Sequence, residues 1–413
     1  MGSYFILAGV LLLAGIVFDI GLFYFLSYLC IAIYAVSRWY VPHSLKKLES
    51  QRSLDSHAFL GDEVAINVRL DNPHRLAVPW LSVWDSVPLE LGRERGIMQV
   101  LNLPGRSRAE FSYTIKPRRR GYYRLGPLYL VSSDLFGFVP QTQSQRPVSH
   151  ITVYPRVTPL AELGLPSRLP FGSLRSRERL FSDPTRPLGI RDYQSGDSQR
   201  HIHWKASGHL RRLVVKTFEP AVSLETALML NLNRDEYSMD RWREGSEFGI
   251  EVAASLAAHL IDRRQSAGFF TNGLDPLGST GSASFDPSSG RLEVTDGEQQ
   301  TQSTAIAPRP GRAQLMKLLE SLARVQVSTG RDFIQWLPEA TLGLGWGTTV
   351  MVITPDGDEQ ACEVMHRLSR RGFNVILIVT ELVYFAPIEQ RAAALGFRAY
   401  RAAARSDLDE WRA

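Results

Sequence analysis

The side chains best suited to chemistry are concentrated in one stretch, Arg191–Lys205, which reads RDYQSGDSQRHIHWK. Its cations, carboxylates, histidines and aromatic rings would suit either an ion-pair network that fixes a domain junction or a surface that binds a partner. His201 and His203 are two residues apart, so in a strand they would share one face and could share a metal ion. The sequence offers no identifiable third ligand, which disfavours a metal there.

Other catalytic signatures are absent from the sequence. It contains no Gly-x-Ser-x-Gly motif, no phosphate-binding loop ending in Lys-Ser/Thr, and no His-Glu-x-x-His. Gly343–Gly347 is glycine-rich but lacks the following lysine, and we interpret it as a loop that enters a strand. Cys30 and Cys362 are too isolated for a disulfide framework or a cysteine metal site. These observations indicate an interaction protein and not an enzyme.

Charge gives only weak guidance on partners. The 413 residues include 47 Lys and Arg against 42 Asp and Glu, a formal net charge of +5. That excess is small for the length, so it argues weakly for anionic partners. We expect lipid headgroups or acidic proteins, and no nucleic acid.

The first forty residues predict a membrane anchor. Tyr4–Val36 is almost entirely apolar, with Asp19 and Ser27 as the exceptions. One helix of that length would reach about 50 Å against a hydrocarbon core of about 30 Å, so two short spans with a turn at Asp19–Gly21 fit better. The two spans place Asp19 at the far interface, where its charge costs little. A single tilted span is the alternative.

The orientation of this anchor follows from basic residues after its second half, namely Arg38, Lys46, Lys47 and Arg52. Positive side chains favour the cytoplasmic side of a membrane. We therefore expect residues 1–40 to form a hairpin in the inner (cytoplasmic) membrane, with the soluble part in the cytoplasm.

The soluble part begins with a β pattern over residues 50–155. Apolar residues alternate with polar ones, as in Val64–Leu70 and Phe111–Ile115, and turn signals such as Asp71–Pro73 separate the runs. This pattern predicts a small antiparallel β-sandwich.

Strands then alternate with helices in residues 211–413, which predicts a largely parallel sheet covered on both faces. The predicted strands include Leu213–Phe218, Thr226–Leu232, Phe269–Phe270, Thr348–Ile353, Phe373–Val379 and Phe397–Tyr400, and the helices Glu247–Arg264, Gly311–Val325, Asp358–Arg370 and Ile388–Leu395. Residues 156–210 are predicted as a connector, with Ile202–Lys205 running into the sheet. Residues 272–310 are predicted as a long polar insert.

The Arg191–Lys205 stretch resembles the central motif of the domain-of-unknown-function family fifty-eight, of the form R-x-Y-x-x-G-D-x-x-R-x-I-x-W-K. The matching residues are Arg191, Tyr193, Gly196, Asp197, Arg200, Ile202, Trp204 and Lys205. His203 stands where an acidic residue is expected. Upstream, Arg120–Tyr123 with Leu125–Pro127 and Asp134–Gly137 are similar to two further elements of that family. The order of anchor, β region and α/β region also agrees.

The resemblance implies a C-terminal domain similar to von Willebrand factor A domains, which have a Rossmann-like α/β fold. It also implies a MoxR-type AAA+ ATPase as cytoplasmic partner, often with a transglutaminase-like membrane protein. The implied role is a membrane adaptor in assembly or maturation of envelope or other protein complexes, without catalytic activity.

Von Willebrand factor A domains can hold Mg²⁺ through hard oxygen ligands on loops that follow the strands. In this sequence the corresponding residues are Asn231, Asn233, Asp235, Thr354 and Asp356. Asn231 replaces the leading aspartate of the family pattern and contributes no charge. We therefore expect a degenerate site without a cofactor, with Mg²⁺ binding as the alternative.

Two other functions remain open at this point. Asp356, Asp235 and His203 could serve a metal-dependent hydrolase. Alternatively, the chain could be a structural protein of the cell envelope with no ATPase partner, and the side of the membrane that carries the β region would separate that function from the adaptor role.

Overall fold

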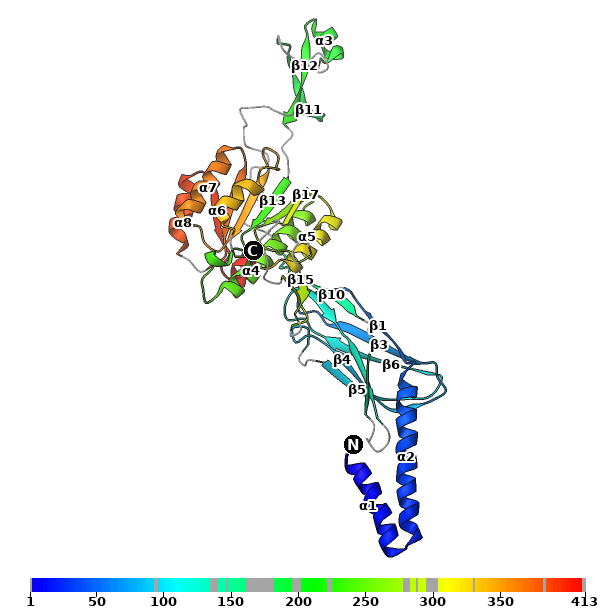
Figure 1. The fold of residues 1–413 in the computed structure, drawn as a ribbon. Helices are drawn as coiled ribbons and strands as arrows, with labels where there is room; N and C mark the ends of the chain where they lie inside the picture. The colour runs from blue at the N-terminus through cyan, green and yellow to red at the C-terminus, as the bar shows by residue number, and fades with distance from the viewer. Residues whose placement is uncertain are drawn as a thin grey trace. The chain divides into compact units, whose positions relative to one another are not determined.

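A computed structural model describes most of the chain (Figure 1). The described residues are 2–92, 96–133, 140–145, 148–160, 182–194, 202–220, 225–277, 283–286, 289–294, 304–329, 331–381 and 384–410. The chain forms two compact units, and two later segments, Leu274–Gln302 and Leu319–Gln326, belong to the N-terminal unit together with Met1–Arg156. The second unit contains the remaining residues.

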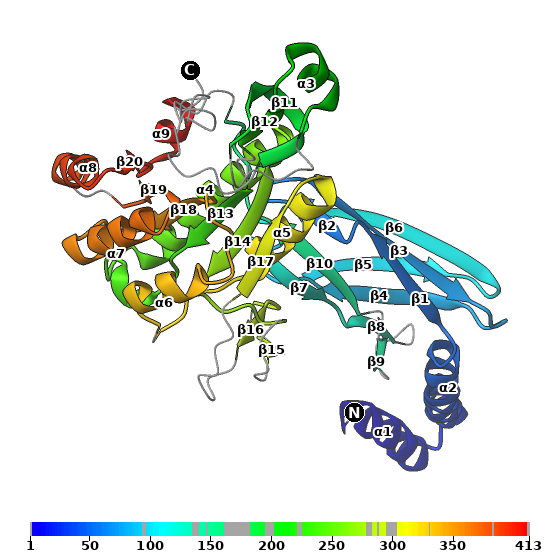
Figure 2. The ribbon, with the colours of Figure 1, turned by 90° about the horizontal axis from the view of Figure 1, so that it is seen from above.

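Two apolar helices begin the first unit, α1 (Gly2–Phe18) and α2 (Gly21–Leu45), and they lie side by side in both views (Figures 1 and 2). The turn between them is the predicted one, and Asp19 adopts a positive φ of 52° there. Ser27 Oγ donates to the Ala8 carbonyl at 3.0 Å, which joins the two helices. Only α2, among the described helices, is long and apolar enough to cross a membrane, while Ile6–Phe18 is a shorter apolar helix. An apolar N-terminal helix suited to membrane anchoring is thus present.

The rest of the first unit is mainly antiparallel β-structure, as the alternating pattern predicted. Its sheets are β1 (Glu49–Leu54), β3 (Val64–Asn72) and β6 (Ser107–Ile115); β2 (His57–Phe59), β10 (Ser149–Tyr154) and β7 (Gly121–Leu125); and β5 (Gly96–Leu103), β4 (Val78–Ser86), β8 (Leu128–Ser132) and β9 (Gln141–Gln145). Alternate residues of β3 enter one hydrophobic core, where Ile66 and Leu70 are fully buried. Val41 and Leu45 of α2 belong to the same core.

The second unit contains a six-stranded sheet in the order β17-β14-β13-β18-β19-β20. Its strands are β13 (Glu225–Leu230), β14 (Ser266–Thr271), β17 (Thr304–Arg309), β18 (Thr349–Thr354), β19 (Asn374–Val379) and β20 (Arg398–Arg401). All neighbours pair in parallel except β17, which is antiparallel to β14. The chain reverses its direction of travel across the sheet between β13 and β18, which is the switch point at which open α/β sheets usually bind ligands.

Helices follow the strands, as the predicted alternation requires. They are α4 (Trp242–Asp262), α5 (Arg312–Arg324), α6 (Phe333–Ala340), α7 (Glu359–Arg370), α8 (Phe385–Ala394) and α9 (Arg405–Glu410). Ala227 and Met229 share a core with α6, α7 and α8 on one face of the sheet. On the other face, Gly249 of α4 lies against Leu230. The buried strands are apolar on both faces because helices cover both.

Several elements differ from the prediction. Thr304–Arg309 was assigned to the polar insert 272–310, but it is the edge strand β17, and the described remainder of the insert includes a small ladder of β15 (Ala283–Phe285) and β16 (Leu292–Val294). Helices α9 and α6 were not predicted, and α6 is only eight residues long and contains Pro338. Asp332 supports its start by accepting a hydrogen bond from the Ile334 amide at 3.2 Å.

Candidate functional site

The Arg191–Lys205 motif lies on a small lobe of three elements, β11 (Ser182–Asp192), α3 (Trp204–Leu210) and β12 (Val214–Pro220). The two strands pair antiparallel, with Arg191 opposite Val215. The ladder continues beyond them, because the Tyr193 amide donates to the Leu213 carbonyl and the His203 amide to the Val214 carbonyl, both at 2.9 Å. We call residues 182–194 and 202–220 the β11–α3–β12 lobe.

This lobe corrects two sequence predictions. The strand predicted at Leu213–Phe218 exists as β12, but its partner is β11 and not the six-stranded sheet. β11 itself lies inside the predicted connector 156–210, because its prolines and register shifts conceal the strand pattern. Ile202–Lys205 was predicted to run into the sheet. Only Ile202 makes an isolated bridge, to Val215, before α3 begins at Trp204.

The motif residues have different environments within the lobe. Trp204 and Lys205 are exposed in the first turn of α3, and Arg191 and Tyr193 are partly buried at the end of β11. His203 caps α3, with Nδ1 accepting from the Ala206 amide at 3.2 Å. The predicted motif residues Gly196, Asp197 and Arg200, like His201, lie outside the described residues.

The surface of the lobe combines exposed apolar side chains with positive charge. Trp204 is 68% exposed, and Ile190, Leu210 and Leu213 are each nearly half exposed. Within residues 189–194 and 202–216, whose side chains are described, the cations are Arg191, Lys205, Arg211, Arg212 and Lys216, and the only carboxylate is Asp192. Asp192 pairs with Arg212 at 2.9 Å on the solvent-exposed side. An exposed indole among cations is suited to binding an acidic surface.

A second group of polar residues lies at the switch point of the six-stranded sheet, where two predicted metal-site residues meet. Asn231 follows β13 and Thr354 ends β18, and both are buried. Asn231 Nδ2 donates to Thr354 Oγ1 at 3.1 Å. Asn233 joins them, because its amide donates to Asn231 Oδ1 at 3.1 Å.

Glu236, which the sequence analysis did not single out, completes this group. Its Oε2 accepts from Asn231 Nδ2 at 2.6 Å, and its Oε1 accepts from Asn233 Nδ2 at 2.9 Å and from the Phe333 amide at 3.0 Å. Asn272 is the other missed member, and its Nδ2 donates to Asn231 Oδ1 at 2.9 Å. Glu236 ends a single 3-10 turn, Arg234–Glu236, and Asn272 directly follows β14, and neither position has a periodic pattern, so the sequence carried no signal for them.

Tyr237 also contacts this group of polar residues. Its hydroxyl is buried and donates to the Asn231 carbonyl at 2.6 Å. Burial, with the nearby carboxylates of Glu381 and Glu236, raises the pKa of Tyr237 well above its usual range. Tyr237 therefore stays a neutral hydrogen-bond donor.

The residues at this edge do not fit a Mg²⁺ ion. Asn231 already uses its amide oxygen for two donors and its amide nitrogen for two acceptors. Glu236 accepts with both carboxylate oxygens, whereas Mg²⁺ requires an octahedron of available oxygens. Asp235 and Asp356 are exposed, and Asp356 Oδ1 accepts from the Gly357 amide at 2.6 Å. The network is thus suited to holding loops.

The residues proposed for a hydrolase are also placed separately. His203 belongs to the β11–α3–β12 lobe, whereas Asp235 and Asp356 follow strands of the six-stranded sheet. In the described part of the chain, no group of three or more His, Cys, Asp or Glu side chains could hold a metal ion. The geometry gives the hydrolase alternative no support.

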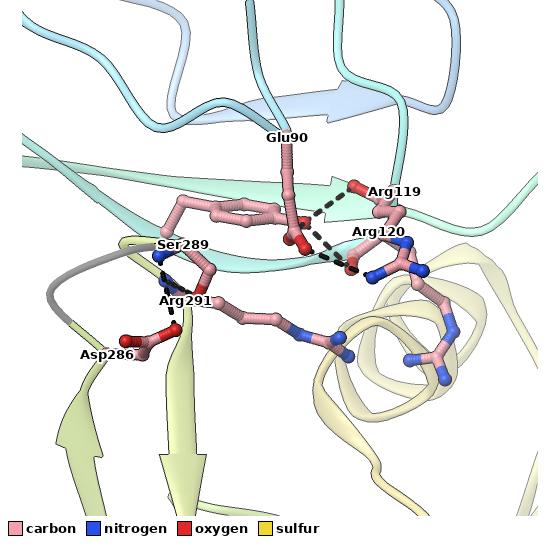
Figure 3. A network of polar contacts seen from close by, with 7 residues as sticks. Glu90, Arg119, Arg120, Asp286, Ser289 and Arg291 are labelled. Carbon is pink, nitrogen blue, oxygen red and sulfur yellow. Dashed lines mark hydrogen bonds and ion pairs between the residues drawn. The ribbon is translucent and has the colours of Figure 1, made fainter. Parts of the chain in front are cut away.

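A third polar network, in the first unit, involves the upstream motif Arg120–Tyr123 (Figure 3). Arg120 is buried and donates through Nη1 to the carbonyls of Ala323 and Val325, at 3.2 and 2.9 Å. The Tyr123 hydroxyl donates to Glu90 Oε2 at 2.7 Å, and Glu90 also pairs with Arg119 at 3.2 Å.

The polar insert joins the same network. Tyr123 bridges to Arg291, and the Arg124 amide donates to the Gly290 carbonyl at 2.9 Å. Asp286 accepts from the Ser289 amide at 3.2 Å, and both residues are labelled in Figure 3. The upstream motif therefore has a structural role, because it holds Leu274–Gln302 within the first unit. Asp134–Gly137, the other upstream element, lies outside the described residues.

Comparison with known proteins singles out the region that contains the lobe and the switch-point network. The family model described as "Protein of unknown function DUF58" matches residues 189–277. Residues 189–277 are thus similar to the DUF58 family, in agreement with the resemblance carried by Arg191–Lys205. A curated relative of this protein is the uncharacterized protein YeaD of Bacillus subtilis (strain 168), 22% identical over 256 residues. That match covers 61% of this chain and 62% of the length of YeaD.

Solved structures resemble the chain only weakly. The CARDB domain of the PF1109 protein from Pyrococcus furiosus is 11% identical, with a TM-score of 0.20, and the match covers 26% of this chain and 92% of that one. A β-glucosidase from Listeria innocua is 12% identical, with a TM-score of 0.18, and covers 26% of this chain and 16% of its own. These scores assign no function to this protein.

Proposed function

We propose that this protein is a membrane-anchored adaptor without enzymatic activity, which binds an acidic surface of a cytoplasmic AAA+ ATPase of the MoxR type. The observation that supports it best is the β11–α3–β12 lobe, where the exposed Trp204 lies among five cations. The resemblance to the DUF58 family suggests the ATPase, and a transglutaminase-like membrane protein is a further candidate partner. The adaptor would act in the assembly or maturation of envelope or other protein complexes.

The proposed anchor is a two-span hairpin of α1 and α2 in the inner membrane. The polar turn at Asp19 and the direct bond between Ser27 and Ala8 are compatible with two adjacent spans. Arg38 lies in the last turns of α2, Lys46 and Lys47 follow it, and these cations favour a cytoplasmic location for the soluble part. The β-structure that follows would be a sandwich.

The α/β part is proposed to be von Willebrand factor A-like. In chain order its strands are arranged 3-2-1-4-5-6, and the third, β17, is the antiparallel one. In this proposal the Asn231 network replaces a metal as the support of the loops at the switch point. Those loops would form a second, metal-independent contact surface for the partner.

In the proposed complex, the cations of the lobe attract the acidic surface of the partner, and the indole of Trp204 becomes buried against it. Cations on the lobe attract an acidic surface from a distance and lose that effect as salt screens them. A tryptophan that becomes buried at an interface centre contributes about 2 kcal/mol or more, which is roughly 30-fold in affinity. Trp204 is exposed enough to lose a large area to a partner.

The test is capture of the partner from detergent-solubilised membranes by tagged full-length protein. We expect an AAA+ ATPase to be enriched by the wild type, and the enrichment to fall strongly with Trp204→Ala and with Lys205→Glu. Trp80→Ala is the matched control, because Trp80 is 55% exposed in the β region of the first unit. If no ATPase is enriched, or if Trp204→Ala captures as much as Trp80→Ala, the proposal is wrong.

The envelope structural alternative is distinguished by topology. Protease added outside intact cells should leave the β region uncut if the soluble part is cytoplasmic, and should cut it after lysis. Cleavage in intact cells would exclude the adaptor function as stated.

A further inference from the structure

The first unit contains a cavity of about 440 Å³ between α2 and the sheet formed by β4, β5, β8 and β9. Its lining residues are Ala32, Ile33, Val36, Ser37, Tyr40, Val41 and Ser44 of α2, Pro79 of β4, and Ser132 and Ser133 at the end of β8. Most of the lining surface is apolar. The volume lies within the range of about 300–1,000 Å³ that is usual for small-molecule sites.

The cavity exists because α2 is held to the β region at one end only. Val41 and Leu45 are buried in the β core, and the Tyr40 hydroxyl donates to the Ala77 carbonyl at 2.7 Å. Two turns earlier, Ala32 and Val36 are largely exposed although they line the cavity. The helix therefore diverges from the core at this level and leaves an apolar recess between them.

The recess lies where α2 would leave a bilayer. Arg38 is the first cation after the apolar run, and Trp39 beside it is 56% exposed, which is typical of an interface. Ala32 is six residues earlier, or about 9 Å deeper along the helix axis. Trp80, next to Pro79 of the lining, is another exposed indole. The cavity thus extends from the interface toward the hydrocarbon.

We propose that this cavity binds one acyl chain of a membrane phospholipid. The apolar lining of Ala32, Ile33 and Val36 matches the chain, and the serines of the β8 end provide hydroxyl groups at the level of the glycerol esters. The surrounding bilayer is the source of the chain, because the cavity is continuous with the lipid-facing side of α2. This proposal rests on the membrane anchor of the proposed function but not on any ATPase partner.

The bound lipid would contact the β region as well as the helix, which gives the experiment its readout. Full-length protein is reconstituted into vesicles of phosphatidylethanolamine and phosphatidylglycerol that contain a phospholipid with a photoreactive diazirine on one acyl chain. After illumination, labelled peptides are identified by mass spectrometry. We expect label on the peptides that carry Pro79 or Ser132–Ser133, in addition to peptides of α1 and α2.

The decisive comparison uses two substitutions of the same residue type on α2. Ala32 lines the cavity, whereas Ala35 is exposed outside it. Ala32→Trp fills the recess and should abolish labelling of the β-region peptides, while Ala35→Trp should label like the wild type. Labelling confined to α1 and α2, or equal labelling of the β region in all three proteins, overturns the proposal. Failure of the protein to float with the vesicles would instead contradict the membrane anchor, so the two failures are distinguishable.

Discussion

A buried ion pair in the β region of the first unit allows the sharpest prediction about stability. Arg52 of β1 donates through Nε to Asp85 Oδ2 at 3.1 Å and through Nη2 to Asp85 Oδ1, and both side chains are fully buried. The Tyr113 hydroxyl of β6 donates to Asp85 Oδ2 at 2.6 Å, and Arg52 also donates to the Leu125 carbonyl at 3.1 Å. Burial and the Asp85 carboxylate raise the pKa of Tyr113, so the tyrosine remains a donor.

The perturbation is Asp85→Asn, which keeps the shape but removes the charge. The Arg52 guanidinium is then left buried without a counter-ion, and breaking such a pair costs about 3–5 kcal/mol. Replacing all three groups, with Arg52→Met, Asp85→Leu and Tyr113→Phe together, leaves no buried charge and removes the hydroxyl that donates to Asp85, so it should cost much less. The triple variant therefore separates the cost of an orphaned charge from the net value of the pair.

The control is an exposed pair of similar geometry on the neighbouring strands. Arg69 Nε lies 2.6 Å from Glu110 Oε1, with side chains 45% and 57% exposed. Glu110→Gln should cost at most about 1 kcal/mol, because solvent screens that pair.

The assay is hydrogen–deuterium exchange of the full-length protein in detergent, read on peptides of β3 and β6. A loss of 3 kcal/mol accelerates exchange through opening of this region by about 100-fold or more. We expect that acceleration for Asp85→Asn and little change for Glu110→Gln. Equal protection in the two single variants would refute the reasoning.

Three further predictions follow from other parts of the structure. Adding Mg²⁺ should leave the unfolding temperature of the protein unchanged, because the polar atoms of the Asn231 network already have hydrogen-bond partners. If Mg²⁺ did bind, a concentration of 100 times its dissociation constant would raise the free energy of unfolding by about 2.7 kcal/mol. Gly290→Ala should speed deuterium exchange of the peptide 283–294, because the φ of Gly290 is +62° and the new Cβ would lie 2.4 Å from Pro88 Cγ. Gly343→Ala is the control and should not change the exchange rate, because a Cβ at Gly343 would meet no atom within 4 Å. Burial raises the pKa of the Cys362 thiol, which is the only thiol left in a Cys30→Ser variant. At pH 8 a maleimide should therefore label Cys362 of this variant only in denaturant. Rapid labelling of the native protein would contradict the burial of Cys362.

Hydrophobic patterns with a period of two or of 3.6 residues predicted the strands and helices that bury one face or both faces. The β3 alternation led directly to the core of the first unit, and the predicted helix Gly311–Val325 is α5, Arg312–Arg324. Elements without such a pattern were missed. β11 carries prolines and charges, and α6 is too short for its periodicity to stand out.

Some residues of the candidate sites were likewise recognised from the sequence, and others were found only in the structure. Trp204 and Lys205 were recognised from the motif, but their helical setting was not, because capping by His203 is a local geometric choice between strand and helix. Asn231, named from the strand-end pattern, is hydrogen-bonded to Thr354 and to Asn233 at the ends of adjacent strands. Glu236 and Asn272, which occupy the polar atoms of Asn231, became visible only in three dimensions.

The sequence by itself determined the apolar N-terminal helices, the two classes of secondary structure and the motif that resembles the DUF58 family, because hydrophobic periodicity and residue identity are local properties. Tertiary structure alone decided which strand β12 joins, how the polar insert is held, and whether the Asn231 group is open to a metal ion. These outcomes depend on hydrogen bonds between residues far apart in the chain, which compete for the same few donors and acceptors. The cavity beside α2 has the same origin, since it exists only where α2 leaves the core that holds its last turns.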